Sequence, residues 1–210
     1  MKKEEEKLTM KQRMDRGLIY DCSIPELLNE QGVYQDYLYD YNQTRPSQGQ
    51  LRMEMLQKIL GSCGEGTYIE PPFYANWGGH NVYMGKYIFA NYHLTCVDDG
   101  NIYIGDYTMI GPNVTITSAG HPIEPGLRMR QMQFNKDVHI GKNVWLGAGV
   151  IVLPGVTIGD NSVIGAGSVV TKDIPADVVA LGSPCRVLRP ISQHDKEFFF
   201  KDERIDWENL

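Results

Sequence analysis

An aliphatic residue recurs at every sixth position through the second half of this 210-residue chain. The positions reached in steps of six from residue 140 hold Ile140, Leu146, Val152, Ile158, Ile164 and Val170. Apolar residues recur about every 3.6 residues on an amphipathic helix and every second residue on a half-buried strand. A period of six fits neither of these, but it fits a short strand followed by a tight turn.

The residues that follow these aliphatic positions add a longer period. Glycine follows the first, second, fourth and fifth of them, at Gly141, Gly147, Gly159 and Gly165, so the pattern repeats after 18 residues. Glycine at such a place permits either a positive φ or a close approach of two backbones. Three strand-and-turn units would return the chain to its starting face. We therefore predict triangular coils whose aliphatic side chains pack on those of the next coil.

The same frame appears upstream of residue 117. Two further sets of three aliphatic positions are Ile104, Ile110 and Ile116 and, more weakly, Val82, Ile88 and Leu94. An insert at 98–101 shifts the phase of the repeat. These sets predict an all-β coil domain over residues 63–190.

Residues 117–138 interrupt the repeat and are predicted to leave the coil as a loop. Long loops inside a compact repeat are more often functional than idle, and a tolerated insertion is the alternative. Near its start the loop contains Gly120-His121-Pro122. Glycine permits a backbone turn and proline restricts the chain directly after it. His121 is therefore the candidate catalytic residue among the five histidines.

Residues 1–62 lack the repeat and are expected to form a helical cap over one end of the coil, where an uncovered strand edge would invite aggregation. Ser47 and Gln50 have the spacing of a capping box, an apolar stripe follows them, and Gly61 ends the pattern. The charged run 1–7 is interpreted as the frayed start of a helix and not as a signal peptide.

Residues 191–210 form a C-terminal extension that contains three phenylalanines and a tryptophan. Aromatic side chains at this density favour burial, so we expect the extension to be packed.

Composition excludes several classes of partner. A formal net charge of -6 provides no overall basic surface for nucleic acid or for an anionic membrane. No apolar run is long enough to span a bilayer. The four cysteines form no C-x-x-C pair, which favours reduced thiols and a cytoplasmic protein.

Several segments outside the aliphatic columns carry a family pattern. They are Glu70-Pro71-Pro72, Ala90-Asn91-Tyr92, Val97-Asp98-Asp99, Pro154-Gly155-Val156, Thr171-Lys172-Asp173 and Gly182-Ser183-Pro184-Cys185-Arg186. Together with the repeat, they resemble the galactoside and maltose O-acetyltransferases of the hexapeptide-repeat family over nearly the whole chain. The resemblance implies a left-handed parallel β-helix and acetyl-coenzyme A (acetyl-CoA) as cosubstrate. It also implies a sugar hydroxyl of galactoside, maltose or glucose type as acceptor, and a homotrimer with active sites between subunits.

The resemblance also implies two catalytic roles. His121 would act as a general base that takes the proton of the acceptor hydroxyl as this oxygen attacks the thioester carbonyl. A free imidazole titrates near pH 6.5 and is largely neutral at pH 7, as a base must be. Direct transfer of this kind needs no protein nucleophile. Asn91 matches the family asparagine that holds the reacting hydroxyl or the developing charge, and its alternative is a turn asparagine bonded to its own backbone.

Four positions match sugar contacts of the family. Asp99 matches a carboxylate that accepts two sugar hydroxyls, with a solvated turn as the alternative. Asp21 is the candidate for an N-terminal aspartate, in a segment that is one residue short. Asn76 stands where the family has a serine, and Gln133 stands where it has a methionine. These two differences leave the identity of the acceptor open.

Coenzyme contacts of the family fall late in the repeat. Ala148 and Ala166 are 18 residues apart and would stack on successive coils, which leaves a groove for a pantetheine arm, although alanine also suits any tight turn. Trp145 matches a tryptophan near the thioester, or else is an aromatic residue packed on a coil. The positions matched to coenzyme contacts are Trp145, Ala148, Ala166, Thr171, Lys172, Arg186 and Arg189. Their basic members suit the coenzyme phosphates.

Three rival functions use the same fold. A zinc enzyme of the γ-class carbonic anhydrase kind would need two histidines five residues apart, and the sequence has no such pair, so no metal is expected. A hexapeptide acetyltransferase with an antibiotic or amine acceptor would share the fold and the histidine. A binding or scaffolding module would need neither His121 nor the basic set.

Overall fold

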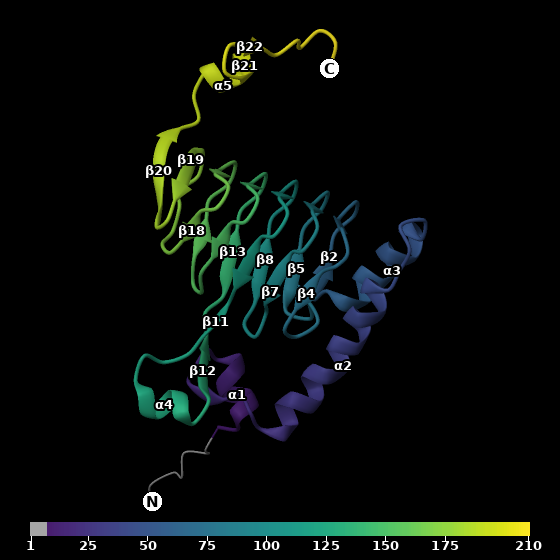
Figure 1. The fold of residues 1–210 in the computed structure, drawn as a ribbon, viewed down its shortest axis with the longest axis vertical. Helices are drawn as coiled ribbons and strands as arrows, with labels where there is room; N and C mark the ends of the chain where they lie inside the picture. Colours follow the sequence, from purple (N-terminus) through teal and green to yellow (C-terminus); the bar gives the residue numbers. More distant parts are fainter. Residues whose placement is uncertain (1–7) are drawn as a thin grey trace, which may run out of the picture.

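The structure is a computed structural model, and it describes residues 8–210. The interpretation of the charged run 1–7 lies outside the described residues. The chain forms a stack of triangular coils with three parallel sheets, which we call faces 1, 2 and 3 (Figure 1). Each complete coil runs from face 3 through face 1 to face 2 before it rises to the next coil.

The strands of each face lie in sequence order along the stack. Face 1 consists of β4 (Tyr74–Ala75), β7 (Thr95–Val97), β10 (Thr115–Thr117), β15 (Ile151–Val152) and β18 (Val169–Val170). Face 2 consists of β2 (Ser62–Cys63), β5 (Val82–Met84), β8 (Ile102–Ile104), β13 (Val138–Ile140) and β16 (Thr157–Ile158). Face 3 consists of β3 (Tyr68–Ile69), β6 (Phe89–Ala90), β9 (Met109–Ile110), β14 (Trp145–Leu146), β17 (Val163–Ile164), β19 (Val178–Gly182) and β20 (Cys185–Pro190). Only β20 is antiparallel to its neighbour within these faces.

The core consists of the aliphatic columns that the six-residue period predicted. Ile116 pairs in register with Val152, and Val152 pairs with Val170, so side chains of successive coils lie directly on one another. All nine aliphatic positions of the two strong sets are buried, namely Ile104, Ile110, Ile116, Ile140, Leu146, Val152, Ile158, Ile164 and Val170. The predicted coil and its shared core are therefore confirmed.

The repeated glycines serve close backbone approach and not a positive φ. A Cβ on Gly147 would lie 2.6 Å from the backbone nitrogen of Ala166 on the next coil. The left-handed conformation occurs two residues later, at Asn143 with φ 53° and at Gly149 with φ 69°. The corners after Ile140 and Leu146 thus combine a glycine that lets the coils stack with a second residue that makes the turn.

Three helices precede the coil: α1 (Met10–Asp15), α2 (Pro25–Asn42) and α3 (Gly49–Ile59), with the short strand β1 (Tyr20–Asp21) between the first two. Helices α2 and α3 lie at the β2 end of the stack (Figure 1), and Leu38, Tyr41 and Leu56 join the main core cluster. The predicted helical cap is confirmed in these elements.

The predicted capping box at Ser47 and Gln50 is wrong. The N-cap of helix α3 is one residue later, at Gln48, and its side chain makes no hydrogen bond to the helix. The Gln48 side chain instead accepts a hydrogen bond from the backbone nitrogen of Arg45 at 2.7 Å, because the preceding turn competes for it. A capping box does occur in α1, between Thr9 and Gln12.

The predicted loop leaves the coil between faces 1 and 2 and contains its own small structure. It holds β11 (Ala119–Gly120), α4 (Pro125–Met129) and β12 (Met132–Asn135). Strand β12 pairs with both β11 and β1, so the loop and the N-terminal segment form one three-stranded sheet beside the coil (Figure 1).

The C-terminal extension contains α5 (His194–Glu197), β21 (Phe198–Phe200) and β22 (Glu203–Arg204). It projects beyond β20, away from the body of the coil (Figure 1). The expectation that its aromatic residues are packed is wrong within this chain, because Phe199 and Trp207 are 65% and 67% exposed. The hairpin of β21 and β22 is too small to bury its own rings.

Candidate active site

His121 directly follows β11, at the base of the loop. The pairing of β11 with β12 places Gly120 opposite Phe134 and brings the imidazole beside the loop backbone. The imidazole is exposed, and its Nδ1 lies 2.8 Å from the carbonyl oxygen of Met132. A carbonyl oxygen only accepts hydrogen bonds, so Nδ1 is the protonated nitrogen and, in the neutral ring, Nε2 has the lone pair. This arrangement holds an imidazole that can accept a proton.

Two of the hollows beside the loop share two lining residues. The larger, of about 610 Å³, lies over face 1 and is lined in part by His121, Asn76 and Gln133. The smaller, of about 260 Å³, is lined by Asn76 and Gln133 again, together with Asp99 and Trp77. Four of the residues that the sequence singled out therefore come together: His121, Asn76, Gln133 and Asp99.

Asp99 is nearly buried and its carboxylate accepts three side-chain hydrogen bonds. The donors are Asn76 Nδ2 at 2.8 Å, Gln133 Nε2 at 2.8 Å and Trp77 Nε1 at 3.3 Å. The alternative interpretation of Asp99 as a solvated turn is therefore wrong. A carboxylate offers about four acceptor directions, so these three bonds leave capacity for one hydroxyl donor.

Tyr20 completes this network, and the sequence analysis missed it. Its hydroxyl accepts from Gln133 Nε2 at 2.6 Å and donates to Asn135 Oδ1 at 3.2 Å. Burial and the neighbouring Asp99 carboxylate raise the pKa of the Tyr20 phenol well above its ordinary value. The one signal in the sequence was its position directly before Asp21.

Asp21 lies beside this cluster, paired with Met132 across the small sheet, whereas Asn91 lies apart from it. The Asp21 carboxylate accepts from the backbone nitrogen and the hydroxyl of Ser23, at 2.9 Å and 2.6 Å, and these bonds lower its pKa. Asp21 lines neither hollow. Asn91 lies at the corner between faces 3 and 1, where its Oδ1 accepts from the backbone nitrogen of Tyr92 at 2.8 Å. This corner is the opposite edge of face 1 from the loop that carries His121.

The residues matched to coenzyme contacts lie on three parts of the coil. Ala148 and Ala166 are exposed at the corner between faces 3 and 1, on coils that are in register through β14 and β17. Trp145 is exposed on face 3, and Thr171 and Lys172 are exposed at the corner between faces 1 and 2. None of these five lines either hollow beside His121.

Arg186 and Arg189 are exposed on β20, the last strand of face 3. The Arg189 guanidinium makes two hydrogen bonds of 2.7 Å with the Asp195 carboxylate, so it already has an anionic partner in the chain. Arg186 donates to the carbonyl oxygen of Cys185 at 2.7 Å.

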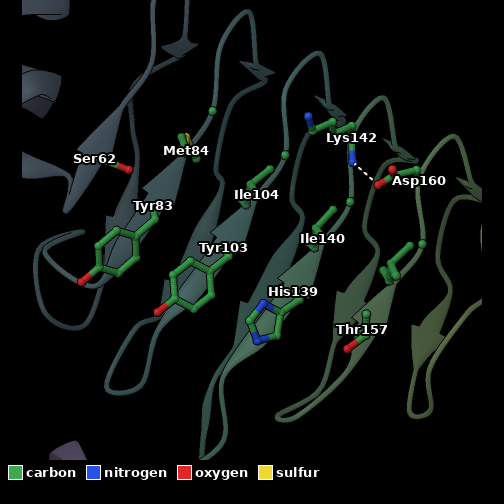
Figure 2. A pocket seen from close by; sticks show the side chains of 15 residues that line it. Ser62, Tyr83, Met84, Tyr103, Ile104, His139, Ile140, Lys142, Thr157 and Asp160 are labelled. Atoms are coloured by element: carbon green, nitrogen blue, oxygen red, sulfur yellow. Dashed lines mark hydrogen bonds between the residues drawn. The ribbon is translucent and has the colours of Figure 1, made fainter.

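A third hollow, of about 510 Å³, lies over face 2 and holds none of the predicted site residues. Figure 2 shows its ladder of Tyr83, Tyr103 and His139, whose ring centroids are 5.0 and 4.9 Å apart. The rings cover one another's faces, which stabilises the stack of coils but leaves little ring surface for a ligand.

Within residues 8–210, no three His, Cys, Asp or Glu side chains gather in an arrangement that would hold a metal ion. Over the same residues, no helix is long and apolar enough to cross a membrane.

Comparisons with known proteins agree with this architecture. Residues 137–172 match the family model described as bacterial transferase hexapeptide (six repeats), and residues 13–64 match the maltose acetyltransferase hexapeptide capping motif. A galactoside O-acetyltransferase of Lactococcus lactis subsp. lactis (strain IL1403) is 50% identical over 95% of this chain and 97% of its own length. A galactoside O-acetyltransferase of Escherichia coli (strain K12) is 41% identical over 95% of this chain and 98% of its own length.

A solved structure of a galactoside acetyltransferase in complex with coenzyme A superposes with a TM-score of 0.92, at 40% identity. The match covers 95% of this chain and 100% of that chain. The chain thus belongs to the hexapeptide-repeat acetyltransferase family, and it is an acyltransferase with a left-handed parallel β-helix. The predicted family and the predicted fold class are confirmed.

Proposed function

We propose that this chain transfers the acetyl group of acetyl-CoA to a hydroxyl of a sugar. The observation that carries the proposal is the imidazole of His121, whose Nε2 lone pair is free beside hollows lined by polar side chains. Two relatives that match over nearly their whole length are named galactoside O-acetyltransferase, and the similar solved structure holds coenzyme A.

The transfer proceeds without a covalent enzyme intermediate. Nε2 of His121 accepts the proton of the acceptor hydroxyl as the oxygen attacks the thioester carbonyl carbon. A C–O bond forms, and the C–S bond breaks when the tetrahedral intermediate collapses. The imidazolium then returns its proton to the departing thiolate, so the coenzyme leaves as a thiol. The Met132 carbonyl holds the ring in the required tautomer and stabilises its charged form.

The acceptor binds in the hollows beside His121. Asn76 and Gln133 line both hollows, and their carboxamides can donate to and accept from sugar hydroxyls. Asp99 lines the smaller hollow, and its carboxylate accepts from sugar hydroxyls. Asp21 is proposed as a further sugar contact through its Oδ2, since both hydrogen bonds from Ser23 are made to Oδ1. Asn76 and Gln133 replace the serine and methionine of the family pattern, and these differences leave the identity of the acceptor open. A screen of candidate acceptors is therefore the way to identify it.

A neighbouring copy supplies the other wall of the site. His121 lies at the corner between faces 1 and 2, whereas Asn91, Ala148 and Ala166 lie at the corner between faces 3 and 1 of the same chain. A homotrimer that sets one corner of each copy against the opposite corner of the next would bring the two sets together. Asn91 of the neighbouring copy then supports the charge that develops during transfer.

The coenzyme lies along this junction. Its pantetheine arm passes Ala148 and Ala166, its thioester lies near Trp145, and its phosphates meet Thr171, Lys172 and Arg186. Arg189 joins this set only by exchanging the Asp195 carboxylate for a phosphate.

The first test is acetyl transfer from acetyl-CoA to galactosides, maltose, glucose, aminoglycosides and simple amines, followed as coenzyme thiol release. We expect activity with a sugar, and His121→Ala should reduce kcat by roughly 10²–10⁴-fold, the usual contribution of a general base. His139→Ala, which removes an exposed imidazole from face 2, is the control and should retain activity. Near-native kcat in a folded His121→Ala protein would remove the base from the mechanism, and activity with amines alone would overturn the sugar acceptor.

The second test concerns the coenzyme. Lys172→Ala and Arg186→Ala should each raise KM for acetyl-CoA and leave kcat nearly unchanged, because phosphate contacts bind the ground state and the transition state alike. Lys142→Ala is the control, since Lys142 lies near Asp106 at the corner between faces 2 and 3. A fall in kcat with a constant KM would contradict the phosphate assignment.

The third test is the assembly itself. Light scattering of the purified protein at micromolar concentration should give the mass of a trimer. A monomer under these conditions would leave Asn91, Ala148 and Ala166 at the wrong edge of face 1 and would contradict the shared site.

A further inference from the structure

The proposed mechanism does not use the side chain of Asp98, although this carboxylate is fully buried. Asp98 begins the turn between β7 and β8, at the corner that also carries the His121 loop. Its carboxylate accepts hydrogen bonds from the backbone nitrogens of Trp77 at 2.7 Å, Gly79 at 3.1 Å and Asn81 at 3.4 Å. All three donors belong to residues 76–81, the turn between β4 and β5.

Residues 76–81 carry part of the proposed acceptor site. Asn76 and Trp77 donate their side-chain hydrogen bonds to Asp99 and line the smaller hollow. The turn itself has an unusual path, with φ of 63° at Gly78 and 94° at Gly79. Backbone hydrogen bonds within the turn, such as His80 N to the Trp77 carbonyl oxygen at 3.0 Å, hold part of this path, and the Asp98 carboxylate adds three bonds from outside the turn.

The turn is also confined from its other side. A Cβ on Gly78 would lie 2.3 Å from the carbonyl oxygen of Tyr34 in α2, and the Tyr34 ring stacks on His80 with centroids 4.0 Å apart. Helix α2 and the Asp98 carboxylate therefore hold the turn between them. Loss of the hydrogen bonds between the turn and the Asp98 carboxylate would allow Asn76 and Trp77 to move away from Asp99.

Asp98 has no salt bridge within residues 8–210. Burial raises its pKa to about 6, against the opposing effect of the backbone donors, and the Asp99 charge adds to the rise. The titratable groups on the elements around it are Cys96 on β7, Asp99 in its own turn, His80 in the turn 76–81, Lys11 on α1, Glu30 on α2 and Asp137 after β12. A buried charge without a cation costs stability, and such charges are concentrated at functional sites.

We propose that the Asp98 carboxylate is a positioning residue for the acceptor, which holds residues 76–81 so that Asn76 and Trp77 complete the acceptor pocket. This inference rests on the proposed sugar acetyltransferase function. Protonation converts one acceptor oxygen into a donor, which then opposes the backbone N–H groups. Acceptor affinity is therefore present when Asp98 is ionised and is lost as pH falls through about 6.

Folding stability responds to the same proton in the opposite direction. Because the folded pKa of Asp98 lies above the ordinary value of 3.8, the native state binds the proton more tightly than the unfolded state does. This contribution therefore favours folding at low pH and is lost as pH rises through the folded pKa. A loss of acceptor affinity near pH 6 is thus separable from unfolding.

The kinetic test uses Asp98→Asn. We expect KM for the acceptor to rise by about tenfold or more. The substitution replaces a charged acceptor with a neutral amide, whose NH2 group would face the backbone N–H donors. KM for acetyl-CoA should not change. The wild-type acceptor KM should rise as pH falls through 6, and that dependence should disappear in Asp98→Asn. Asp106→Asn is the matched control, because Asp106 makes the same kind of bond, to Lys86 N at 2.9 Å, at the corner between faces 2 and 3.

A second measurement does not depend on activity. Trp77 is buried beside both carboxylates, and a Trp145→Phe, Trp207→Phe protein leaves it as the one tryptophan. In this parent protein, the Trp77 emission should titrate with a midpoint near pH 6. The transition should be absent after Asp98→Asn. If that variant does not fold, the transition in the parent protein is the remaining test. Emission that is constant between pH 5 and 7.5, or an unchanged acceptor KM in folded Asp98→Asn, would overturn the proposal. A protein that transfers acetyl to no sugar but shows the Trp77 transition would overturn the proposed function and leave the role of Asp98 in the turn intact.

Discussion

Burial of aliphatic side chains between successive coils is the interaction on which the rest of this structure depends. Each coil alone is a ring of two- and three-residue strands that could not bury its own apolar side chains. Stacking in register, as for Ile116, Val152 and Val170, removes these side chains from water on both sides. The strict register also fixes the corners, because a slip of one residue would turn the aliphatic column outward.

Fixed corners give the protein places at which insertions do not disturb the core. The corner between faces 1 and 2 carries three such departures: residues 76–81, the turn 98–101 and the loop 117–138. They contact one another through Asp98, Asp99, Asn135 and Gln133. The candidate active site is therefore made of the parts of the chain that the repeat does not specify, held in place by the part that it does.

The sequence predicted the coil well because its signal is local and repeated. The period of six identified the buried columns, and the break in that period identified the loop and His121. The partners of Asp99 could not be predicted in this way, since Gln133 is 34 residues from Asp99 and Tyr20 is 113 residues from Gln133, and no period links them. The prediction of a capping box at Ser47 was wrong because the Gln48 side chain bonds to the preceding turn. The prediction of a packed C-terminal extension was wrong because burial of Phe199 and Trp207 depends on surroundings that local composition does not describe.

We propose that one corner of each copy completes the site at the opposite corner of its neighbour. Co-expression of two inactive variants tests this most directly: His121→Ala, and Ala148→Arg, whose side chain would fill the proposed pantetheine groove. Mixed oligomers isolated through two different affinity tags contain sites in which an intact His121 of one copy faces an intact Ala148 of the next. We predict that these oligomers regain a substantial fraction of native activity, while each variant alone stays inactive. Mixed oligomers that form and remain inactive would contradict a site shared between copies and place the whole site within a single chain.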